Sequence, residues 1–128
     1  YIKANNLKNI VKLIGYKKQP YSYIQKADIF VLTSKYEGLP NVLLEAQYLN
    51  KYIISTNCPT GPREILLNGK AGDLFKVGDY KKLASIINKY NLNKKNISIK
   101  ISIGFKNFNR FDYFKNCNKY YKFVLENF

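Results

Sequence analysis

Two short, uninterrupted apolar runs constrain this fold more than any other feature of the sequence. Residues 29–33 (Ile-Phe-Val-Leu-Thr) and 52–56 (Tyr-Ile-Ile-Ser-Thr) have the length of strands, with apolar side chains at successive positions. Such runs are typical of strands in a parallel sheet that helices cover on both faces. Each run is followed by turn residues and an amphipathic segment. We therefore predict an α/β fold with a Rossmann-like, doubly wound parallel sheet.

Shorter elements complete the predicted order. Residues 10–14 (Ile-Val-Lys-Leu-Ile) are predicted as a strand that stops at Gly15, and a short helix follows Pro20. Residues 72–75 are predicted as a brief strand, and Asp79 as the cap of the next helix. The predicted core face of that helix consists of Leu83, Ile86 and Ile87.

Length and composition exclude several classes of protein. The chain has 128 residues and is 46% hydrophobic, which is enough to fill the core of one domain. Since no apolar run approaches the ~20 residues of a membrane span and no signal-peptide pattern is present, we expect neither an integral membrane nor a secreted protein. The chain contains no His, so imidazole acid–base catalysis and His metal ligation are excluded. Cys58 and Cys117 fit no metal-ligand spacing and are typical of reduced cytoplasmic thiols.

The net charge of +14 leaves three interpretations open. An A/T-rich coding sequence would favour Lys, Asn, Ile, Tyr and Phe, all of which are abundant here. An anionic partner, either a membrane surface or a phosphate ligand, would also attract lysines. Nucleic acid is disfavoured, because only Arg63 and Arg110 are arginines, and arginine is the residue suited to bidentate recognition. If a membrane is the partner, we expect the contact in the Lys- and aromatic-rich segment after Phe105.

The helix predicted after Pro40 has the features of an anion-binding site. The unpaired amides around Asn41 and Val42, together with the helix dipole, attract an anion such as a diphosphate. The preceding loop lies at the carboxyl end of a parallel strand, where open α/β sheets bind their ligands. Glu45, one turn into the helix, can accept both hydroxyls of a ribose, and Glu37 on the loop can reach a sugar hydroxyl. From spacing alone, both glutamates could equally be solvated surface charges.

A longer pattern surrounds these glutamates. The stretches ADIFVLTSKYEGLPNVLLEAQ and IISTNCPTGPREILLNGKAGDLFKVGD closely resemble the donor-binding domain of retaining glycosyltransferase family 4, also called glycosyl transferases group 1. The resemblance includes an E-x7-E block that runs from Glu37 to Glu45. It implies the C-terminal half of a GT-B fold, in which two Rossmann-like domains face each other across a cleft. In that family the C-terminal domain holds most of the nucleotide sugar.

The resemblance implies roles for individual residues. Glu45 matches the glutamate that binds the nucleotide ribose. Glu37, the implied catalytic residue, matches the one near the donor sugar and the leaving phosphate. The main chain between and after them matches the stretch that contacts sugar hydroxyls and phosphate: Gly38, Leu39, Pro40, Asn41 and Val42. A weaker match places the loop beside the nucleotide base at Gly15, Tyr16 and Lys17.

Other positions have two interpretations each. The segment from Thr60 to Glu64 opens another helix near the same sheet edge, where it could contact the donor or serve as scaffold. Tyr21 and Tyr23 could flank the base or pack in the core. Cys58 is predicted to be buried.

The chain departs from the family pattern in two places. The strand, glycine turn and helix that carry a basic pair for the diphosphate are missing upstream, as is the acceptor-binding domain. We therefore expect a fragment or a truncated gene product that is inactive alone. Residues 97–103 alternate apolar and polar side chains, which alone predicts a strand, whereas the family has a helix there. We predict the helix, because tertiary context overrides β propensity.

Two units are thus expected: residues 1–92 as a nucleotide-sugar-binding domain that lacks its first strand–helix unit, and residues 93–128 as a helical segment that packs on it. The expected function is the binding of a nucleotide-diphosphate sugar, with UDP as the expected nucleotide, for transfer of a hexose or N-acetylhexosamine to a glycan or lipid-linked acceptor of the cell envelope. A non-catalytic nucleotide-sugar-binding module and a fragment of a GT-B nucleotide-sugar epimerase are the alternatives. We expect no metal and no cofactor, because helix amides and basic groups can stabilise the leaving phosphate. The expected location is cytoplasmic, with possible peripheral contact at the membrane's cytoplasmic face.

Overall fold

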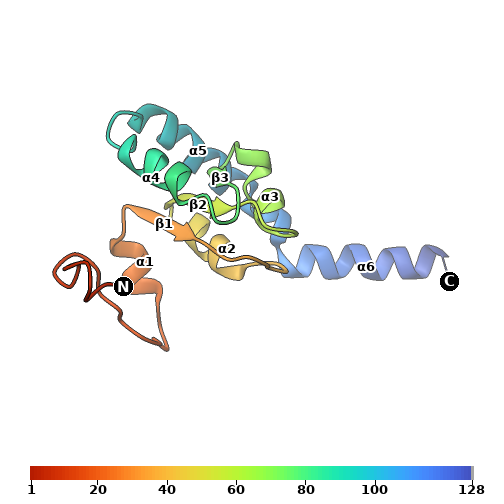
Figure 1. The fold of residues 1–128 in the computed structure, drawn as a ribbon. Helices are drawn as coiled ribbons and strands as arrows, with labels where there is room; N and C mark the ends of the chain where they lie inside the picture. Colours follow the sequence, from red (N-terminus) through yellow and green to blue (C-terminus); the bar gives the residue numbers. More distant parts are fainter. Residues whose placement is uncertain (128) are drawn as a thin grey trace.

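A parallel sheet forms the centre of the protein, whose computed structural model describes residues 1–127. Its strands are ordered β1–β2–β3, with β1 at Ile29–Leu32, β2 at Tyr52–Thr56 and β3 at Asp73–Phe75. All pairings are parallel: Ile29 lies opposite Tyr52, and Ile54 opposite Asp73. Helices lie on both sides of the sheet (Figure 1), which confirms the predicted α/β fold.

The helices follow the predicted order closely. Within residues 1–127 they are α1 Tyr21–Lys26, α2 Asn41–Tyr48, α3 Pro62–Ile65, α4 Tyr80–Asn88, α5 Lys94–Asn107 and α6 Tyr113–Asn127, with 3-10 helices η1 Leu67–Gly69 and η2 Phe108–Phe111. The Asp79 side chain accepts a hydrogen bond from the Lys82 amide, 2.9 Å away, and so caps α4 as predicted. Residues 97–103 are helical, also as predicted. Ile97 and Ile101 lie one turn apart on α5 and both pack against the sheet.

Successive residues of each strand face opposite helical layers. On one face, Ile53 of β2 packs with α1, α2, α3 and the residue after α3, through Ile24, Leu43, Ala46, Ile65 and Leu66. On the other face, Tyr52 and Ile54 pack with β3 and with α4, α5 and their connection, through Phe75, Leu83, Ile86, Tyr90, Ile97 and Ile101. The strands therefore separate two hydrophobic clusters, as the uninterrupted apolar runs predicted.

Residues 10–14 do not form the predicted strand. The segment has no regular secondary structure, and Ile10 and Leu13 are 78% and 86% exposed. No strand among residues 1–127 pairs with it, and the amides of Ile10 and Val11 donate instead to the carbonyl oxygen of Leu7, at 3.0 and 2.8 Å. A second expectation also fails: Ile87 is exposed, and the core face of α4 consists of Leu83 and Ile86.

The C-terminal segment has one part that packs on the rest of the protein and one part that does not. Helix α5 packs against β2 and α2, and η2 contacts α2. Helix α6 extends away from the sheet (Figure 1), and none of its residues is buried. The packing expected for residues 93–128 is therefore wrong for α6, whose apolar side chains have no facing surface within residues 1–127; Phe128 lies outside the described residues. Among residues 1–127, no helix is both long and apolar enough to cross a membrane.

Candidate functional site

Two loops meet at the carboxyl edge of the sheet. One follows β1 and contains Glu37, and the other follows β2 and contains Thr60. The Thr56 hydroxyl donates a hydrogen bond to the carbonyl oxygen of Ser34, 2.7 Å away. The Thr60 hydroxyl donates to the carbonyl oxygen of Glu37. The second loop therefore holds the main chain of the first.

Gly61 brings the two loops into direct contact. Its φ angle is +77°, a conformation that residues with a side chain rarely adopt. A Cβ atom at this position would overlap the carbonyl oxygen of Gly38 and the Cδ atom of Pro40. The close approach of the loops thus depends on a glycine, and it fixes the entry into α2.

The start of α2 presents free amides. Pro40 is the buried residue before the helix, and its carbonyl oxygen accepts from the Leu43 amide at 2.9 Å. The amides of Asn41 and Val42 precede this bond and have no backbone acceptor among the described residues. These amides lie at the positive end of the helix dipole, so the start of α2 is suited to an anion, as the sequence predicted.

A groove beside α2 contains Glu45. Its volume is about 540 Å³, and it is lined by Tyr21, Asn41, Leu44, Glu45, Tyr48, Leu49 and Phe108. The rings of Tyr48 and Phe108 lie 5.7 Å apart. Glu45 is half-buried, and within residues 1–127 its carboxylate forms no ion pair and accepts no hydrogen bond. The groove thus combines one available carboxylate with aromatic and aliphatic walls.

Glu37 lies in the loop between β1 and α2. It is half-buried, and its carboxylate has no ion-pair or hydrogen-bond partner among the described residues. It does not line the Glu45 groove. The structure therefore brings Asn41 and Glu45 into one groove and leaves Glu37 on the loop before it.

The predicted base-binding loop is not part of the Glu45 groove. Gly15, Tyr16 and Lys17 are exposed, with Tyr16 90% exposed, and they line no part of the Glu45 groove. Tyr21 lines the groove and Tyr23 does not; both rings are exposed, so neither packs in the core.

The segment after β2 lines a second hollow, with a volume of about 610 Å³. Arg63 Nε donates to the side-chain oxygen of Asn57, 3.2 Å away, across this hollow. Cys58 is buried there, as predicted. Thr60 and Gly61 serve as scaffold for the Glu37 loop.

Sequence reasoning missed two walls of the Glu45 groove. Tyr48 lies three residues beyond Glu45 on the same helix face, so its helical spacing could have identified it. Phe108 comes from η2, far along the chain, and no local pattern connects it with α2.

Comparison with known proteins identifies the family of this chain. The family described as Glycosyl transferases group 1 matches residues 1–100. The chain belongs to this family. An uncharacterized glycosyltransferase of Methanocaldococcus jannaschii, MJ1059, is 51% identical over 61 residues, which is 48% of this chain and 15% of that protein. A lipopolysaccharide 1,6-galactosyltransferase of Escherichia coli is 31% identical over 94 residues, or 70% of this chain and 26% of that protein. This glycosyl transferases group 1 chain thus spans about a quarter or less of these relatives.

A solved structure shares the fold. The Anabaena protein Alr3699/HepE, crystallised with UDP, superposes with a TM-score of 0.84 over 99% of this chain and 35% of its own, at 22% identity. At that identity the similarity establishes the GT-B type of α/β fold for the matched region and nothing finer.

Proposed function

We propose that this chain is the C-terminal, donor-binding domain of a retaining glycosyltransferase of family 4 and that it binds a UDP-sugar. The observation that carries the proposal is the start of α2, where the free amides of Asn41 and Val42 adjoin a groove containing an unpaired Glu45. The family match and the UDP complex of HepE, whose fold this chain shares, support the choice of ligand.

Each part of the donor has a partner in this arrangement. The diphosphate lies at the α2 amides, which stabilise the negative charge that grows on it as the sugar leaves. The ribose diol donates to the carboxylate of Glu45. Glu37 and the main chain of Gly38, Leu39 and Pro40 contact the sugar. Because amides and the helix dipole supply the charge stabilisation, transfer needs no metal, and turnover unchanged by a chelator would support this point.

The substitution Glu45→Gln tests the site directly. A charge-assisted hydrogen bond contributes about 1.5–3 kcal/mol, so the Kd for UDP should rise about 10- to 150-fold, measured by calorimetry on the chain. Glu126→Gln, which removes an exposed carboxylate from α6, is the matched control and should leave the Kd unchanged. Equal affinity of both variants for UDP would remove Glu45 from the site.

Transfer itself requires an acceptor-binding part. We propose that the acceptor is a glycan or a lipid-linked sugar of the cell envelope and that a hexose or N-acetylhexosamine is transferred. The name of the E. coli relative, a lipopolysaccharide galactosyltransferase, supports this acceptor class. The 128-residue chain alone should bind UDP-glucose without releasing UDP from it. Release of UDP or conversion to a second UDP-sugar by the chain would contradict this division of labour.

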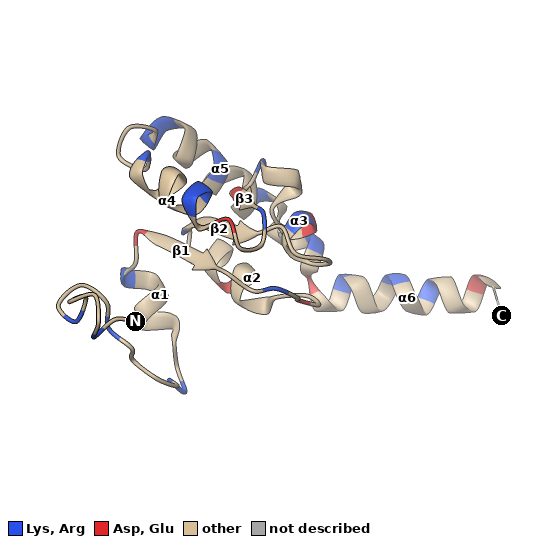
Figure 2. Cartoon of the chain, viewed as in Figure 1, with Lys and Arg blue, Asp and Glu red and all other residues tan. Residues whose placement is uncertain are grey.

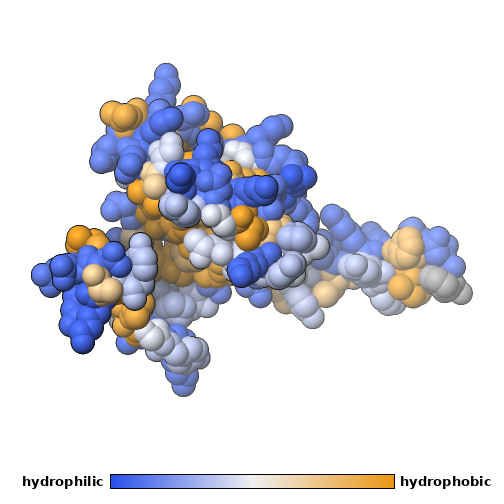
Figure 3. Space-filling model, in the orientation of Figure 1, coloured by the Kyte–Doolittle hydropathy of each residue, from blue (hydrophilic) through white to orange (hydrophobic). Residues whose placement is uncertain are grey.

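We also infer that α6 attaches the protein to an anionic membrane surface. Lys and Arg are spread over most elements (Figure 2), which fits compositional bias, but on α6 the lysines follow one side. Lys115, Lys119 and Lys122 recur at helical spacing, and the opposite side carries exposed Tyr113, Tyr120 and Val124. Figure 3 shows hydrophobic residues beside hydrophilic ones along this protruding helix. A basic, aromatic amphipathic helix is suited to lie in a membrane interface, with its lysines toward anionic headgroups.

A further inference from the structure

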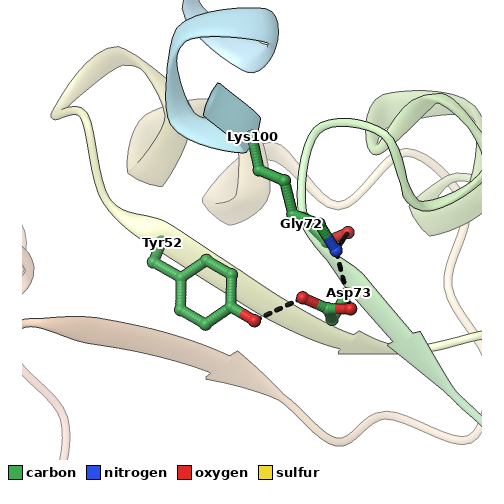
Figure 4. A network of polar contacts seen from close by, with 4 residues as sticks. All are labelled: Tyr52, Gly72, Asp73 and Lys100. Carbon is green, nitrogen blue, oxygen red and sulfur yellow. Dashed lines mark hydrogen bonds and ion pairs between the residues drawn. The ribbon is translucent and has the colours of Figure 1, made fainter. Parts of the chain in front are cut away.

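A polar network occupies the amino ends of β2 and β3. The Tyr52 hydroxyl donates a hydrogen bond to Asp73, and Lys100 Nζ lies 2.7 Å from the other carboxylate oxygen (Figure 4). Lys100 also donates to the carbonyl oxygen of Gly72 at 3.3 Å. Burial of the phenol, together with its bond to Asp73, raises the pKa of Tyr52 above its usual value, so the phenol keeps its proton. Asp73 is therefore fully engaged by a donor and a cation.

This network forms the floor of a pocket between α4 and α5, which we call the α4–α5 pocket. Its volume is about 190 Å³, and it is lined by Tyr52, Asp73, Lys82, Ser85, Ile86, Lys89, Asn93, Asn96, Ile97 and Lys100. The lining residues of α4 and α5 recur three and four positions apart, so one face of each helix is turned toward the pocket. The pocket is thus lined mainly by residues of strands and helices, with Lys89 and Asn93 at the helix ends.

Cations in the α4–α5 pocket exceed anions. Asp73 is its one lining carboxylate, and Lys100 already pairs with it. Within residues 1–127, Lys82 and Lys89 have no carboxylate within ion-pair distance. Two ammonium groups therefore line the pocket without a counter-ion from the described part of the chain.

The start of α5 adds further donors. Asn93 precedes the helix but its side chain forms no capping hydrogen bond, and Asn96 lies in the first turn. Both line the pocket, together with the hydroxyl of Ser85. The positive end of the α5 dipole thus reinforces the two lysines. Ammonium, amide and hydroxyl donors around one small space suit an acceptor-rich dianion.

We propose that the α4–α5 pocket binds the phosphoryl group of a small phosphorylated molecule. The site is separate from the UDP-sugar site, because Tyr52 and Asp73 begin their strands, whereas Glu37 and Thr60 lie in loops that follow strand ends. Its volume is about a third of the Glu45 groove, so it admits a phosphoryl group with a short attached moiety and excludes a nucleotide sugar.

Inorganic phosphate is the probe, titrated into the 128-residue chain at low ionic strength by calorimetry. The test variant is Lys82→Gln/Lys89→Gln. The matched control is Lys81→Gln/Lys94→Gln, which removes the same charge from the same two helices at exposed positions outside the pocket. Removing both pocket lysines should weaken phosphate binding by about tenfold, and the control should change it less than twofold. Thermal unfolding followed by circular dichroism establishes that both variants keep the fold.

Three results would overturn the proposal: no phosphate binding by the unmodified chain, equal loss in both double variants, or loss of phosphate binding when UDP saturates the donor site. The first would show that the lysines are only solvated, the second that general surface charge attracts phosphate, and the third that phosphate occupies the donor site. Vesicles containing phosphatidic acid test a lipid source of the same group. Vesicle binding that depends on Lys82 and Lys89, without binding of free phosphate, would also refute a small-molecule site.

Discussion

Substitution of Gly61 by alanine tests whether the contact between the two loops positions the proposed donor site. The substitution should destabilise the fold in two ways, through backbone strain and through steric overlap. A side chain at φ +77° strains the backbone by about 1–3 kcal/mol. The new Cβ also overlaps the Gly38 oxygen and Pro40 Cδ, and overpacking of this kind costs about 1–3 kcal/mol more. We therefore expect the free energy of unfolding to fall by about 2–6 kcal/mol.

Gly69→Ala is the control because it isolates the first cost. Gly69 has a φ of +91°, and nothing lies within 4 Å of a Cβ built on it. The difference between the two variants in urea unfolding therefore measures the contact between the loops. UDP affinity should also fall in Gly61→Ala, because the Pro40 entry into α2 must shift, and should persist in Gly69→Ala. Equal destabilisation of both variants, with UDP affinity retained in both, would refute the view that this contact fixes the site.

Three further predictions concern separate parts of the protein. In an enzyme that joins this domain to an acceptor-binding domain, Glu37→Ala should lower kcat about 100-fold or more and leave UDP affinity within about twofold. Loss of UDP binding with kcat retained would reverse the roles of the two glutamates. Tyr52→Phe should lower the free energy of unfolding by about 1–2 kcal/mol at neutral pH, through loss of the bond to Asp73. Because folding raises the pKa of Tyr52, the contribution of that proton is present below the ordinary tyrosine value of about 10. It is lost as pH rises through the higher folded value, so the two proteins should converge in strongly alkaline urea titrations, and a constant difference would contradict this. The chain should co-sediment with anionic vesicles at low salt, release at high salt, and bind about 30-fold more weakly after Lys119→Gln/Lys122→Gln; equal indifference to anionic and neutral vesicles would remove α6 as a membrane contact.

The central strands could be predicted from the sequence because their own residues show the pattern of a buried strand. The apolar side chains of a run such as β2 are shielded from water only where helices cover both faces of the strand, and Tyr52–Thr56 is buried throughout. Residues 10–14 have a similar local composition but failed as a strand. A strand also needs a hydrogen-bonding neighbour, and local composition does not reveal whether one is present. The same limit applies to Ile87, because local composition does not reveal which side chains of α4 reach the sheet.

The residues of the candidate site also fall into some that the sequence could predict and some that it could not. Asn41 and Glu45 could be predicted because a helix start and its next turn are adjacent in sequence. Phe108 and the Tyr52–Asp73–Lys100 network could not, because each is assembled by pairing between distant elements. Ile54 lies opposite Asp73 in the register of β2 and β3, which brings Asp73 next to the start of β2. Only the folded sheet fixes that register.

The alternation of side chains along β2 has a consequence for how the two halves of the molecule can change. Ile53 faces the layer that carries the Glu45 groove, and its neighbours Tyr52 and Ile54 face the layer that carries the α4–α5 pocket. Residue exchanges at alternate positions of one short strand therefore alter one layer while the other keeps its packing. Natural variation, or directed evolution, should thus be able to change the Glu45 groove and the α4–α5 pocket independently, while the backbone pairing of the sheet that both layers share stays the same.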